Sequence, residues 1–502
     1  MANPLYDTLF GRHAGKSTPF IYLADGRCIS HAAFLEQVAQ ISHAVTALGL
    51  QAGDRLAAQV EKSPEALALY AACAQTGVVF LPLNTAYTAT EVSYFVKDCG
   101  AVLFVCDGRN MDALTPMAQA AKAQIVTMNA DGSGSLMDQA ATMPTTFGTV
   151  ARTGDDLAGL LYTSGTTGRS KGAMMTQTNL ISNAETLAKS WHFTDRDVLL
   201  HALPIFHTHG LFAATNVTLV AGGSMIFLPK FDLDQVIEQL PMATSMMGVP
   251  TFYTRLLGDP RFDRDLTKHM RLFVSGSAPL LAETHIQFEN RTGHRILERY
   301  GMTETNMNIS NPYDGERRAG TVGFALPGIE VKITDANGIE VADDEVGQIE
   351  VRGPNVFKGY WQMPEKTAEE LRDNGFFITG DLGTRDSDGY ITIVGRDKDL
   401  IISGGYNIYP KEVELVLDAQ PGVLESAVIG VPHPDFGETV LAVLVVKDGA
   451  VLDMDAITAA VGESLARFKH PRKMVILDEL PRNTMGKVQK NLLRDQFAGT
   501  FA

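Results

Sequence analysis

Short apolar runs alternate with longer segments of helical periodicity over the first three quarters of the chain. Residues 102–106 and 225–228 are uninterrupted apolar runs of strand length, whereas 32–48 and 64–76 repeat their apolar positions at the spacing of a helix. Alternation of this kind is typical of parallel sheets whose faces are covered by helices. We therefore expect an α/β fold with a large N-terminal domain of parallel sheets.

The pattern changes near residue 322. Residues 322–351 contain short strand-like runs and the turn sequence Asp335-Ala-Asn-Gly338, which predicts a small β-rich subdomain. After Lys398 the pattern restarts, with expected elements at 410–419 (helix), 423–431 and 439–447 (strands), 454–467 (helix) and 474–477 (strand). About 105 residues are enough for an independent α+β domain. We therefore predict domains at 1–397 and 398–502, the second small and mobile, with Lys398 as the hinge.

Composition and charge exclude several classes of protein. Of the 502 residues, 45% are hydrophobic and 20% are charged, which is typical of a globular chain of two or more domains. The net charge of −16 argues against a nucleic-acid partner or an acidic membrane surface, and no apolar run approaches the roughly 18 residues of a membrane span. The N-terminus lacks a basic start followed by an apolar core, so we expect a cytoplasmic protein. The four cysteines form no CxxC pair, which supports neither a disulfide framework nor a zinc site.

A glycine- and hydroxyl-rich segment follows the apolar run 157–161. It reads Tyr162-Thr-Ser-Gly-Thr-Thr-Gly-Arg-Ser-Lys-Gly172. Glycines let the backbone approach an anion, hydroxyl groups donate hydrogen bonds, and Lys171 adds a positive charge. The spacing of the lysine differs from that of a Walker loop, which argues against an ordinary P-loop NTPase. We expect a phosphate-binding loop, with a plain surface turn as the alternative.

Five more polar segments follow along the chain, and one of them is a second glycine-rich turn, Ser403-Gly-Gly-Tyr-Asn-Ile-Tyr-Pro410. Glu304 ends the run Tyr300-Gly-Met-Thr-Glu304 and is a candidate Mg²⁺ ligand, although a lone glutamate near a turn is more often solvated. Asp381 is suited to accept hydrogen bonds from two ribose hydroxyls, with a simple Asx turn as the alternative. Arg396 adds a guanidinium for phosphate or ribose. Lys487 lies in a turn near the C-terminus, where a lysine is normally exposed to solvent.

Together and in this order, these segments resemble the adenylate-forming superfamily of acyl-CoA synthetases, adenylation domains and firefly-type luciferases. The resemblance spans nearly the whole chain, and Ser170 stands where the family usually has proline. It implies that ATP and CoA are co-substrates and that Mg²⁺ is the cofactor. It assigns the phosphates to Thr163, Ser164, Gly165, Thr166, Thr167, Gly168 and Lys171, adenine to Ser277, Ala278, Pro279, Glu298 and Tyr300, further nucleotide contacts to Gly301 and Met302, and ribose to Asp381 and Arg396.

The reaction of this superfamily has two steps. A carboxylate first attacks the α-phosphorus of ATP, so two anions must be brought together, and positive charge stabilises the transition state. A thiol then attacks the acyl-adenylate, which implies a rotation of the small domain about its hinge. The resemblance assigns phosphate and Mg²⁺ to Thr303 and Glu304, the bridge between carboxylate and phosphate to Lys487, the CoA site to Gly404, Gly405 and Tyr406, and a gate to His207.

Two arginines near the expected acid pocket indicate the kind of acid. Arg299 precedes Tyr300, where many relatives carry glycine, and Arg255 follows residues 249–253, which border the acyl pocket in the family. Each on its own is as well explained as a surface arginine. Together they favour a second carboxylate in the substrate, because guanidinium groups match carboxylates and a buried arginine without a partner is costly. We predict a short dicarboxylic acid, with Ser277 as an additional hydroxyl donor to its distal carboxylate.

Within the superfamily, residues 249–256 and 298–305 resemble bacterial malonyl-CoA synthetases. This implies the ligation of malonate, with methylmalonate as a possible second substrate, to CoA through an acyl-adenylate, with AMP and pyrophosphate as the other products. The alternatives are an enzyme for another short acid, an enzyme that loads a carrier protein, and a non-catalytic nucleotide-binding sensor. Similar synthetases are controlled by acetylation, so we also expect a lysine acetyltransferase and a deacetylase that act on Lys487.

Overall fold

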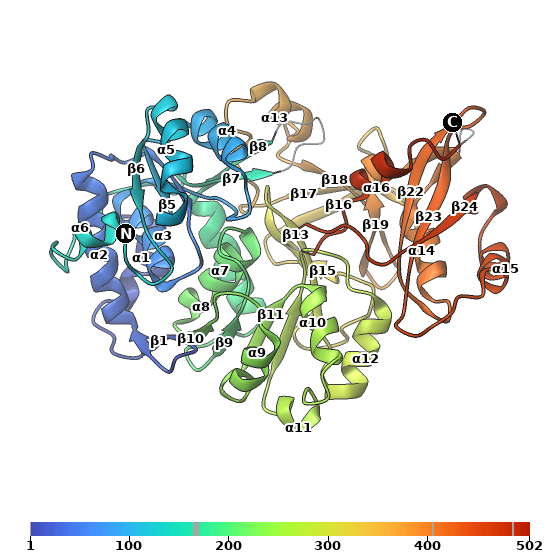
Figure 1. The fold of residues 1–502 in the computed structure, drawn as a ribbon, viewed down its shortest axis with the longest axis horizontal. Helices are drawn as coiled ribbons and strands as arrows, with labels where there is room; N and C mark the ends of the chain where they lie inside the picture. Colours follow the sequence, from blue (N-terminus) through green and yellow to red (C-terminus); the bar gives the residue numbers. More distant parts are fainter. Residues whose placement is uncertain (1, 164–169, 404–405, 484–485, 502) are drawn as a thin grey trace. The chain divides into compact units, whose positions relative to one another are not determined.

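The structure of the protein, a computed structural model, describes residues 2–163, 170–403, 406–483 and 486–501. Its contacts divide the chain into two compact units, whose elements are labelled in Figure 1. Unit 1 comprises Met1–Glu330 and Val351–Phe377, and unit 2 comprises Val331–Glu350 and Ile378–Ala502. Each unit is described by itself.

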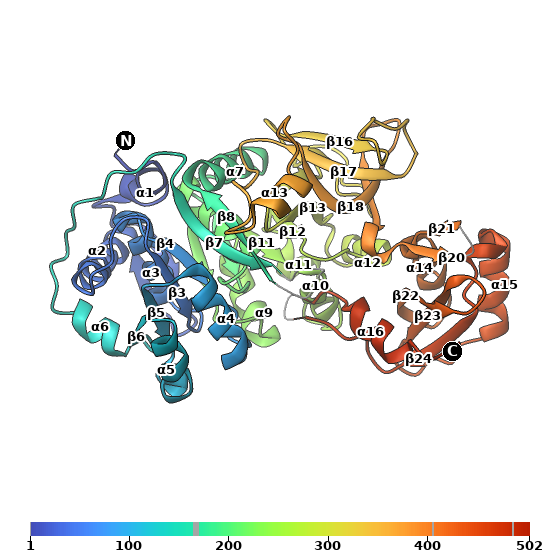
Figure 2. The ribbon, with the colours of Figure 1, turned by 90° about the horizontal axis from the view of Figure 1, so that it is seen from above.

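Unit 1 is built on two sheets with mainly parallel strands, which are seen from a second direction in Figure 2. The first sheet has the order β15 (Phe324–Ala325), β14 (Asn306–Ser310), β13 (Leu297–Met302), β12 (Leu272–Ser275), β11 (Ser245–Gly248), β9 (Val198–His201), β10 (Ser224–Phe227), β1 (Pro19–Tyr22) and β2 (Cys28–Ser30). The second has the order β6 (Gln124–Thr127), β5 (Leu103–Cys106), β3 (Arg55–Gln59), β4 (Val79–Pro82), β7 (Leu157–Thr163) and β8 (Lys171–Thr176).

Helices cover these sheets. The α-helices of unit 1 are α1 (Pro4–Leu9), α2 (His31–Ala47), α3 (Pro64–Thr76), α4 (Ala89–Cys99), α5 (Met111–Ala120), α6 (Ser135–Ala140), α7 (Gln177–Ser190), α8 (Asn216–Ala221), α9 (Leu233–Gln239), α10 (Pro250–Leu257), α11 (Arg264–Thr267), α12 (Ala282–Thr292) and α13 (Pro364–Glu370). A π-helix, η3 (His209–Thr215), leads into α8, and 3₁₀ turns occupy η1 (Gly11–His13), η2 (Gly108–Asn110) and η4 (Leu240–Met242).

The core of unit 1 includes two apolar clusters between helices and sheets. In one, Phe95 of α4 and Leu114 of α5 pack against Phe104 of β5. In the other, Tyr253 of α10 and Phe288 of α12 join a cluster that includes residues of β9, β10, β11 and β12. Burial of this apolar surface is the main force that holds helices on sheets, at about 25 cal/mol per Å². The ends of the parallel strands are thereby fixed in space, and most of the predicted site residues of unit 1 lie on strands and the loops that follow them, whereas Arg255 lies on α10.

Unit 2 contains two sheets with antiparallel strand pairs. The four-stranded sheet has the order β16 (Glu330–Thr334), β17 (Gly347–Arg352), β18 (Phe377–Arg385) and β19 (Ile391–Arg396). The other has the order β21 (Tyr406–Ile408), β20 (Ile401–Ser403), β23 (Gly437–Val446) and β22 (Val423–His433), with β24 (Lys473–Leu477) parallel to β23. Its helices are α14 (Pro410–Asp418), α15 (Met454–Ser464) and α16 (Lys490–Phe497), with 3₁₀ turns η5 (Asp397–Asp399) and η6 (Arg467–Lys469).

The α/β fold predicted from the sequence is confirmed. The β-rich segment expected at 322–351 does contain a turn at Asp335, where the Asp335 N–H donates to the carbonyl of Ile339 at 2.8 Å. Most of this segment clusters with unit 2 in the structure, so the compact units do not divide at residue 397. The boundary at 397/398 concerns a hinge, and it stays a prediction. Within the described ranges of the chain, no helix is long and apolar enough to cross a membrane.

Candidate active site

The predicted phosphate-binding segment lies between two antiparallel strands. Thr163, the last residue of β7, is opposite Lys171, the first residue of β8. The five predicted ligands Ser164, Gly165, Thr166, Thr167 and Gly168 lie outside the described residues. At the unusual position 170, the backbone carbonyl accepts a hydrogen bond of 2.8 Å from the hydroxyl of Tyr94. This contact uses only the backbone, so it is compatible with either serine or proline.

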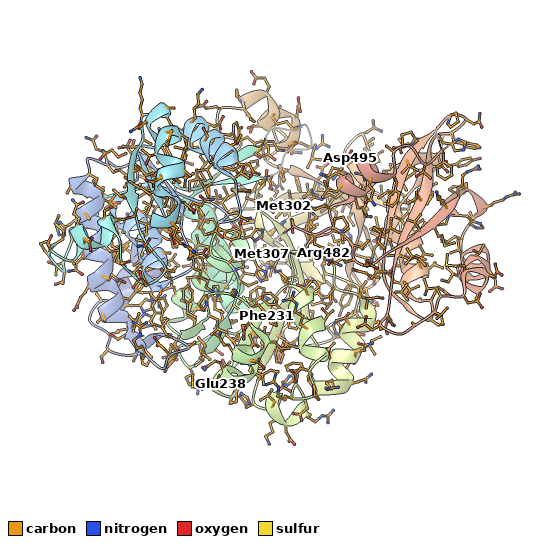
Figure 3. All side chains as sticks on the ribbon, viewed as in Figure 1. Phe231, Glu238, Met302, Met307, Arg482 and Asp495 are labelled. Atoms are coloured by element: carbon orange, nitrogen blue, oxygen red, sulfur yellow. The ribbon has the colours of Figure 1, made fainter. Side chains whose placement is uncertain are left out.

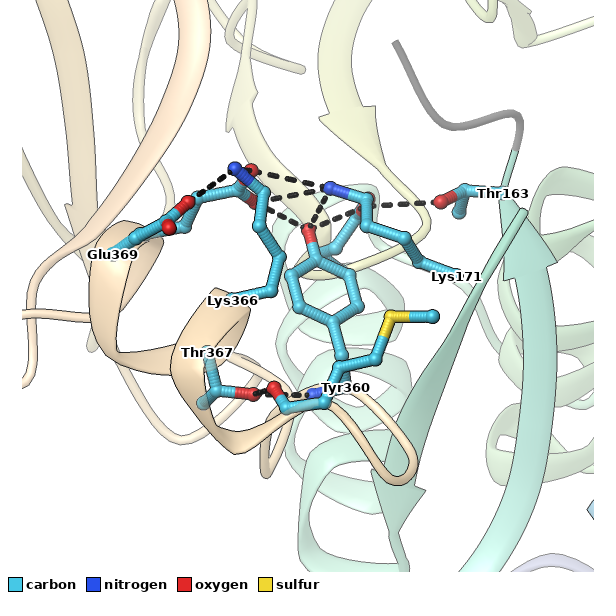
Figure 4. Close-up of polar contacts among 9 residues, drawn as sticks. Thr163, Lys171, Tyr360, Lys366, Thr367 and Glu369 are labelled. Carbon is cyan, nitrogen blue, oxygen red and sulfur yellow. Dashed lines mark hydrogen bonds and ion pairs between the residues drawn. The ribbon is translucent and has the colours of Figure 1, made fainter. Parts of the chain in front are cut away.

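Lys171 is part of a polar cluster with two carboxylates, drawn in Figure 4. Its ammonium lies 3.0 Å from the hydroxyl of Tyr360 and 3.2 Å from both carboxylate oxygens of Glu370. Tyr360 donates to Glu370 at 2.5 Å, and its hydroxyl is also 3.0 Å from Oε1 of Glu304. The hydroxyl of Thr163 donates to the same Oε1 at 3.4 Å. The two ends of the predicted phosphate loop and the predicted metal ligand therefore meet around one tyrosine.

Glu304 is a buried carboxylate, with 4% of the residue exposed. Burial raises its pKa, against the opposing effect of nearby Lys171. The pKa of Glu370 is lowered, because its hydrogen bonds from Tyr360 and Lys366 and the charge of Lys171 outweigh the effect of burial. The cluster thus contains one carboxylate whose pKa is lowered, Glu370, and one whose pKa is raised, Glu304. The described residues contain no group of three or more His, Cys, Asp or Glu side chains that would form a metal site.

The residues before Glu304 lie on β13 and in the turn after it. Tyr300, Gly301, Met302 and Thr303 are all half-buried. A Cβ at position 301 would collide with the backbone of Asn306, where the antiparallel pairing of β13 and β14 shifts its register. Only glycine fits this close approach. The backbone that leads to Thr303 and Glu304 therefore has little freedom to move.

Arg299 is a buried guanidinium without an acidic partner among the described residues. Only 4% of the residue is exposed, and neither Nε nor Nη2 has a hydrogen-bond partner. Burial lowers its pKa to about 9, and the neighbouring Tyr253 opposes this change only in part. A Cβ at Gly276 would lie 2.5 Å from Nη1 and 2.6 Å from Nε, so the guanidinium fills the space that the glycine leaves open. Two charged donors are thus available for an anion.

Ser277 and His209 lie next to this guanidinium. Ser277 has a left-handed backbone with φ of +73°, which is uncommon for a residue other than glycine and is typical of functional turns. Its hydroxyl is 3.1 Å from Nδ1 of His209, the first residue of η3. Burial lowers the pKa of His209 well below its usual value, and Arg299, His207 and His201 lower it further. His209 is therefore neutral, and the positive charge that favours an anion at this place is that of Arg299.

His209 was not singled out from the sequence, where His207 was the predicted gate. In the structure His207 Nδ1 accepts a hydrogen bond of 3.2 Å from the backbone N–H of His209. His207 thus contacts the backbone of the residue that contacts Ser277. The run Phe206-His-Thr-His209 contains both histidines, but nothing in its spacing distinguishes the one that lies nearer to Arg299. The gating role of His207 stays a prediction.

The structure does not place Arg255 together with Arg299. Arg255 lies on the exposed side of α10, and its guanidinium carbon is 5.9 Å from the ring centroid of Phe231, a residue labelled in Figure 3. The two arginines that the sequence treated alike therefore differ in burial. A carboxylate role for Arg255 stays a prediction.

The predicted adenine contacts have different surroundings. Ala278 is half-buried and Pro279 is exposed, in the loop that follows β12. Glu298 is buried, and its Oε1 lies 3.2 Å from Nδ1 of His285 and 3.4 Å from the backbone nitrogen of Gly320. Burial raises the pKa of Glu298, although His285 opposes this. The carboxylate of Glu298 is thus engaged by protein groups, and its part in nucleotide binding stays a prediction.

In unit 2, the two predicted ribose ligands face each other across antiparallel strands. Asp381 of β18 is opposite Arg396 of β19, and the Arg396 Nε lies 2.9 Å from a carboxylate oxygen of Asp381. The hydroxyl of Thr379 accepts a hydrogen bond of 3.1 Å from the backbone N–H of Asp381. Asp381 is buried, whereas 31% of the Arg396 side chain is exposed. The structure therefore brings together the pair that the sequence linked only by resemblance.

Lys487 has an altered pKa within the same unit. Loss of water around its ammonium lowers the pKa to about 8, with Arg396 and Lys398 adding repulsion and Asp381 and Asp399 opposing it. Its backbone is held by Asn483, whose side-chain oxygen accepts from the Lys487 N–H at 3.0 Å.

Two ion pairs, which link residues distant in the chain, fix α16, the helix after Lys487. Lys490 lies 2.5 Å from Glu414, and Arg494 lies 2.5 Å from Asp399. The second pair joins α16 to η5, which contains the predicted hinge residue Lys398 at an exposed position.

Of the predicted CoA site, Gly404 and Gly405 lie outside the described residues. Tyr406 begins β21 and is 58% exposed, so its ring is accessible to a ligand. It stacks on Phe468, with ring centroids 4.6 Å apart. CoA binding by this segment stays a prediction.

Comparison with known proteins places the chain in a family. Models described as AMP-binding enzyme and AMP-binding enzyme C-terminal domain match residues 11–361 and 412–487. The crystal structure of ATP-bound MatB from Rhodopseudomonas palustris is 55% identical, with a TM-score of 0.98 and full coverage of both chains. The malonate–CoA ligase of Arabidopsis thaliana is 35% identical over 456 residues, which are 84% of this chain and 74% of that protein. The probable CoA ligase CCL8 of Humulus lupulus is 41% identical over 368 residues, which are 67% of this chain and 60% of that longer protein. The chain belongs to the AMP-binding enzyme family.

Proposed function

We propose that this protein ligates malonate to CoA with ATP, through malonyl-adenylate. In the first step a carboxylate oxygen bonds to the α-phosphorus of ATP and pyrophosphate leaves. In the second, the CoA sulfur bonds to the acyl carbon, the thiol proton is lost and AMP leaves. Membership in the family and the malonate–CoA ligase among the relatives support the reaction class. The buried guanidinium of Arg299, with two unpartnered nitrogen donors, supports an acid that carries a second carboxylate.

The chain's own groups would meet the charge that develops during adenylation. Thr163 and Lys171 would contact phosphate, and Lys487 would bridge the attacking carboxylate and the α-phosphate. Asp381 and Arg396 would hold the ribose. A magnesium ion usually binds through one or two carboxylates together with substrate phosphates, and Glu304 fits that demand, because it is a buried carboxylate with the hydroxyl groups of Thr163 and Tyr360 beside it. When bound, Mg²⁺ would neutralise phosphate charge.

The proposed selectivity for malonate depends on recognition of the second carboxylate of the substrate. A guanidinium can form two parallel hydrogen bonds to a carboxylate, and each charge-assisted bond contributes about 1.5–3 kcal/mol. In Arg299 these donors are already desolvated, so the cost of removing water has been met before the acid binds. The hydroxyl of Ser277 would add a third donor, and Arg255 would contribute only if its side chain turns away from Phe231.

Free CoA is the proposed thiol, and Tyr406 and the two glycines before it would contact it. The reaction is proposed to take place in the cytoplasm, where ATP and CoA are available.

The function is tested by measuring acid-dependent AMP formation with malonate, methylmalonate, succinate and acetate. The wild type is compared with Arg299→Met and Arg255→Met. We expect a preference for malonate that Arg299→Met removes and Arg255→Met reduces less. A preference for acetate that is indifferent to Arg299 would contradict the choice of malonate, and AMP formation with a carrier protein but not CoA would contradict the choice of thiol.

A further inference from the structure

We propose that Glu370 is a positioning residue for Lys171: it holds the ammonium in place and yields it to the phosphates of ATP, and so it sets the affinity for ATP and pyrophosphate. The inference rests on the proposed phosphate role of Lys171, but not on the identity of the acid. The observation that supports it is the direct ion pair between the side chains of Lys171 and Glu370.

The ion pair is largely shielded from water. The side chains of Lys171 and Glu370 are 13% and 22% exposed, and the ammonium lies 3.2 Å from both carboxylate oxygens. Tyr360 completes a triangle, because its hydroxyl accepts from Lys171 at 3.0 Å and donates to Glu370 at 2.5 Å (Figure 4). Shielded pairs are screened less by salt than exposed ones, so this carboxylate competes effectively with a phosphate for the same ammonium.

The two partners are carried by segments that are fastened to each other. Tyr360 pairs with Ala173 of β8, and the Trp361 N–H donates to the carbonyl of Gly172 at 2.7 Å. The hydroxyl of Thr367 in α13 accepts from the Tyr360 N–H at 2.9 Å. The strand that begins with Lys171 and the helix that ends with Glu370 therefore share one framework. The ion pair is therefore held by the hydrogen-bonded backbone of unit 1, unlike an ion pair between two mobile surface side chains.

Glu370 keeps other partners when Lys171 turns to a phosphate. Lys366 lies 2.9 Å from Oε1 of Glu370, and Tyr360 still donates to Oε2. The exchange thus leaves no partly buried carboxylate without a partner, which would otherwise be costly. Phosphate has to displace one carboxylate from one ammonium. Glu370 thus has two effects. It orients Lys171 before ATP binds, and it makes the phosphates bind less tightly than they would to a lysine without a carboxylate partner.

The test is the replacement Glu370→Gln, which keeps the size of the side chain and removes its charge. Dissociation constants for ATP and for pyrophosphate are measured by titration calorimetry with Mg²⁺ and without acid or CoA. We expect both constants to fall roughly three- to tenfold. In turnover the KM for ATP falls, and kcat falls as well because pyrophosphate leaves more slowly.

Glu369→Gln is the matched control, because Glu369 is the adjacent residue, its side chain is 64% exposed, and its ion pair is to Lys366. Its constants should equal those of the wild type. In a Lys171→Met background, Glu370→Gln should no longer tighten binding, since the partner is gone. Thermal unfolding of each variant verifies that it is folded.

Three outcomes would overturn the proposal. The first is that Glu370→Gln binds ATP and pyrophosphate no more tightly than the wild type. The second is that Glu370→Gln tightens binding equally in the Lys171→Met background, which would indicate a general charge effect. The third is that Glu370→Gln requires more Mg²⁺, which would make Glu370 a metal ligand. Because no acid is present in the binding experiment, a protein that shows the expected shift yet activates no dicarboxylic acid would disprove the proposed function while the inference on Glu370 stands.

Discussion

The guanidinium of Arg299 occupies the space that Gly276 leaves free, with Nε 2.6 Å from where a Cβ of residue 276 would be. We therefore predict that Gly276→Ala displaces the end of the arginine side chain and raises the KM for malonate by about tenfold or more, the effect of losing roughly one charge-assisted hydrogen bond. Gly148→Ala is the control, because nothing lies within 4 Å of its added Cβ. Steady-state kinetics with malonate and acetate measure the effect; a KM for malonate that stays at the wild-type value would argue against this geometry.

Arg299 should be costly for stability because its charge is buried without an acid. We expect Arg299→Met to raise the free energy of unfolding by about 1–3 kcal/mol, since it removes unsatisfied donors. Urea unfolding measures this change. Malonate should stabilise the wild type against unfolding by mass action but leave Arg299→Met unaffected. A variant less stable than the wild type would show that the guanidinium contributes to folding instead.

The first half-reaction should lose rate at high pH. The pKa of Lys487 is lowered to about 8, so the ammonium that is proposed to bridge carboxylate and phosphate is present below pH 8 and lost as the pH rises through it. Malonate-dependent exchange of pyrophosphate into ATP, measured from pH 6.5 to 9.5, should decline with an apparent pKa near 8. Lys487→Arg should move the decline to a higher pH or remove it. An unaltered profile in this variant would assign the decline to another group.

Lys487 should also react readily with acetyl donors. At pH 8 about half of its amine is neutral, against less than about 1% for an ordinary lysine of pKa 10.4. Mass spectrometry after limited treatment with acetyl phosphate should find Lys487 modified before the exposed Lys268, whose side chain is 70% accessible. Acetylation should abolish adenylation but spare thioester formation from preformed malonyl-adenylate. Full adenylation by the acetylated protein would end the idea of control at this lysine.

Two stacked histidines should make the protein sensitive to acid. His13 and His31 are buried with ring centroids 4.4 Å apart, and burial lowers the pKa of each to about 4. The unfolded chain binds protons below pH 6.5 that the folded protein does not, so stability should fall between pH 6.5 and 4, by about 1.4 kcal/mol per pH unit for each histidine. Urea unfolding at several pH values should show a smaller slope for His31→Phe. His192→Asn, at an exposed position, should leave the slope unchanged.

Local features of the fold were predictable, because their causes lie close together in the chain. Helix α3 has the bounds expected at 64–76: the Ser63 hydroxyl caps its first turn, Pro64 begins it and Gly77 ends it with φ of +75°. The contact of Lys171 with Glu370 joins residues 199 positions apart, and no periodicity encodes such a pair. Burial separated Arg299 from Arg255, because one lies on a strand within a sheet and the other on the outer face of a helix. Long-range packing decides such questions, and sequence patterns do not report it.

Arg299 and Tyr300 are successive residues of β13, and successive side chains of a strand point to opposite faces of its sheet. An acid bound by Arg299, as proposed, would therefore lie on the opposite face of the sheet from the side chain of Tyr300, although the two residues are neighbours in the chain. A substitution at residue 299 should therefore change the surroundings of the acid and leave the side-chain contacts of Tyr300 on the other face in place. The residue that is proposed to bind the acid and the residue on the other face of the sheet can therefore be substituted independently of each other.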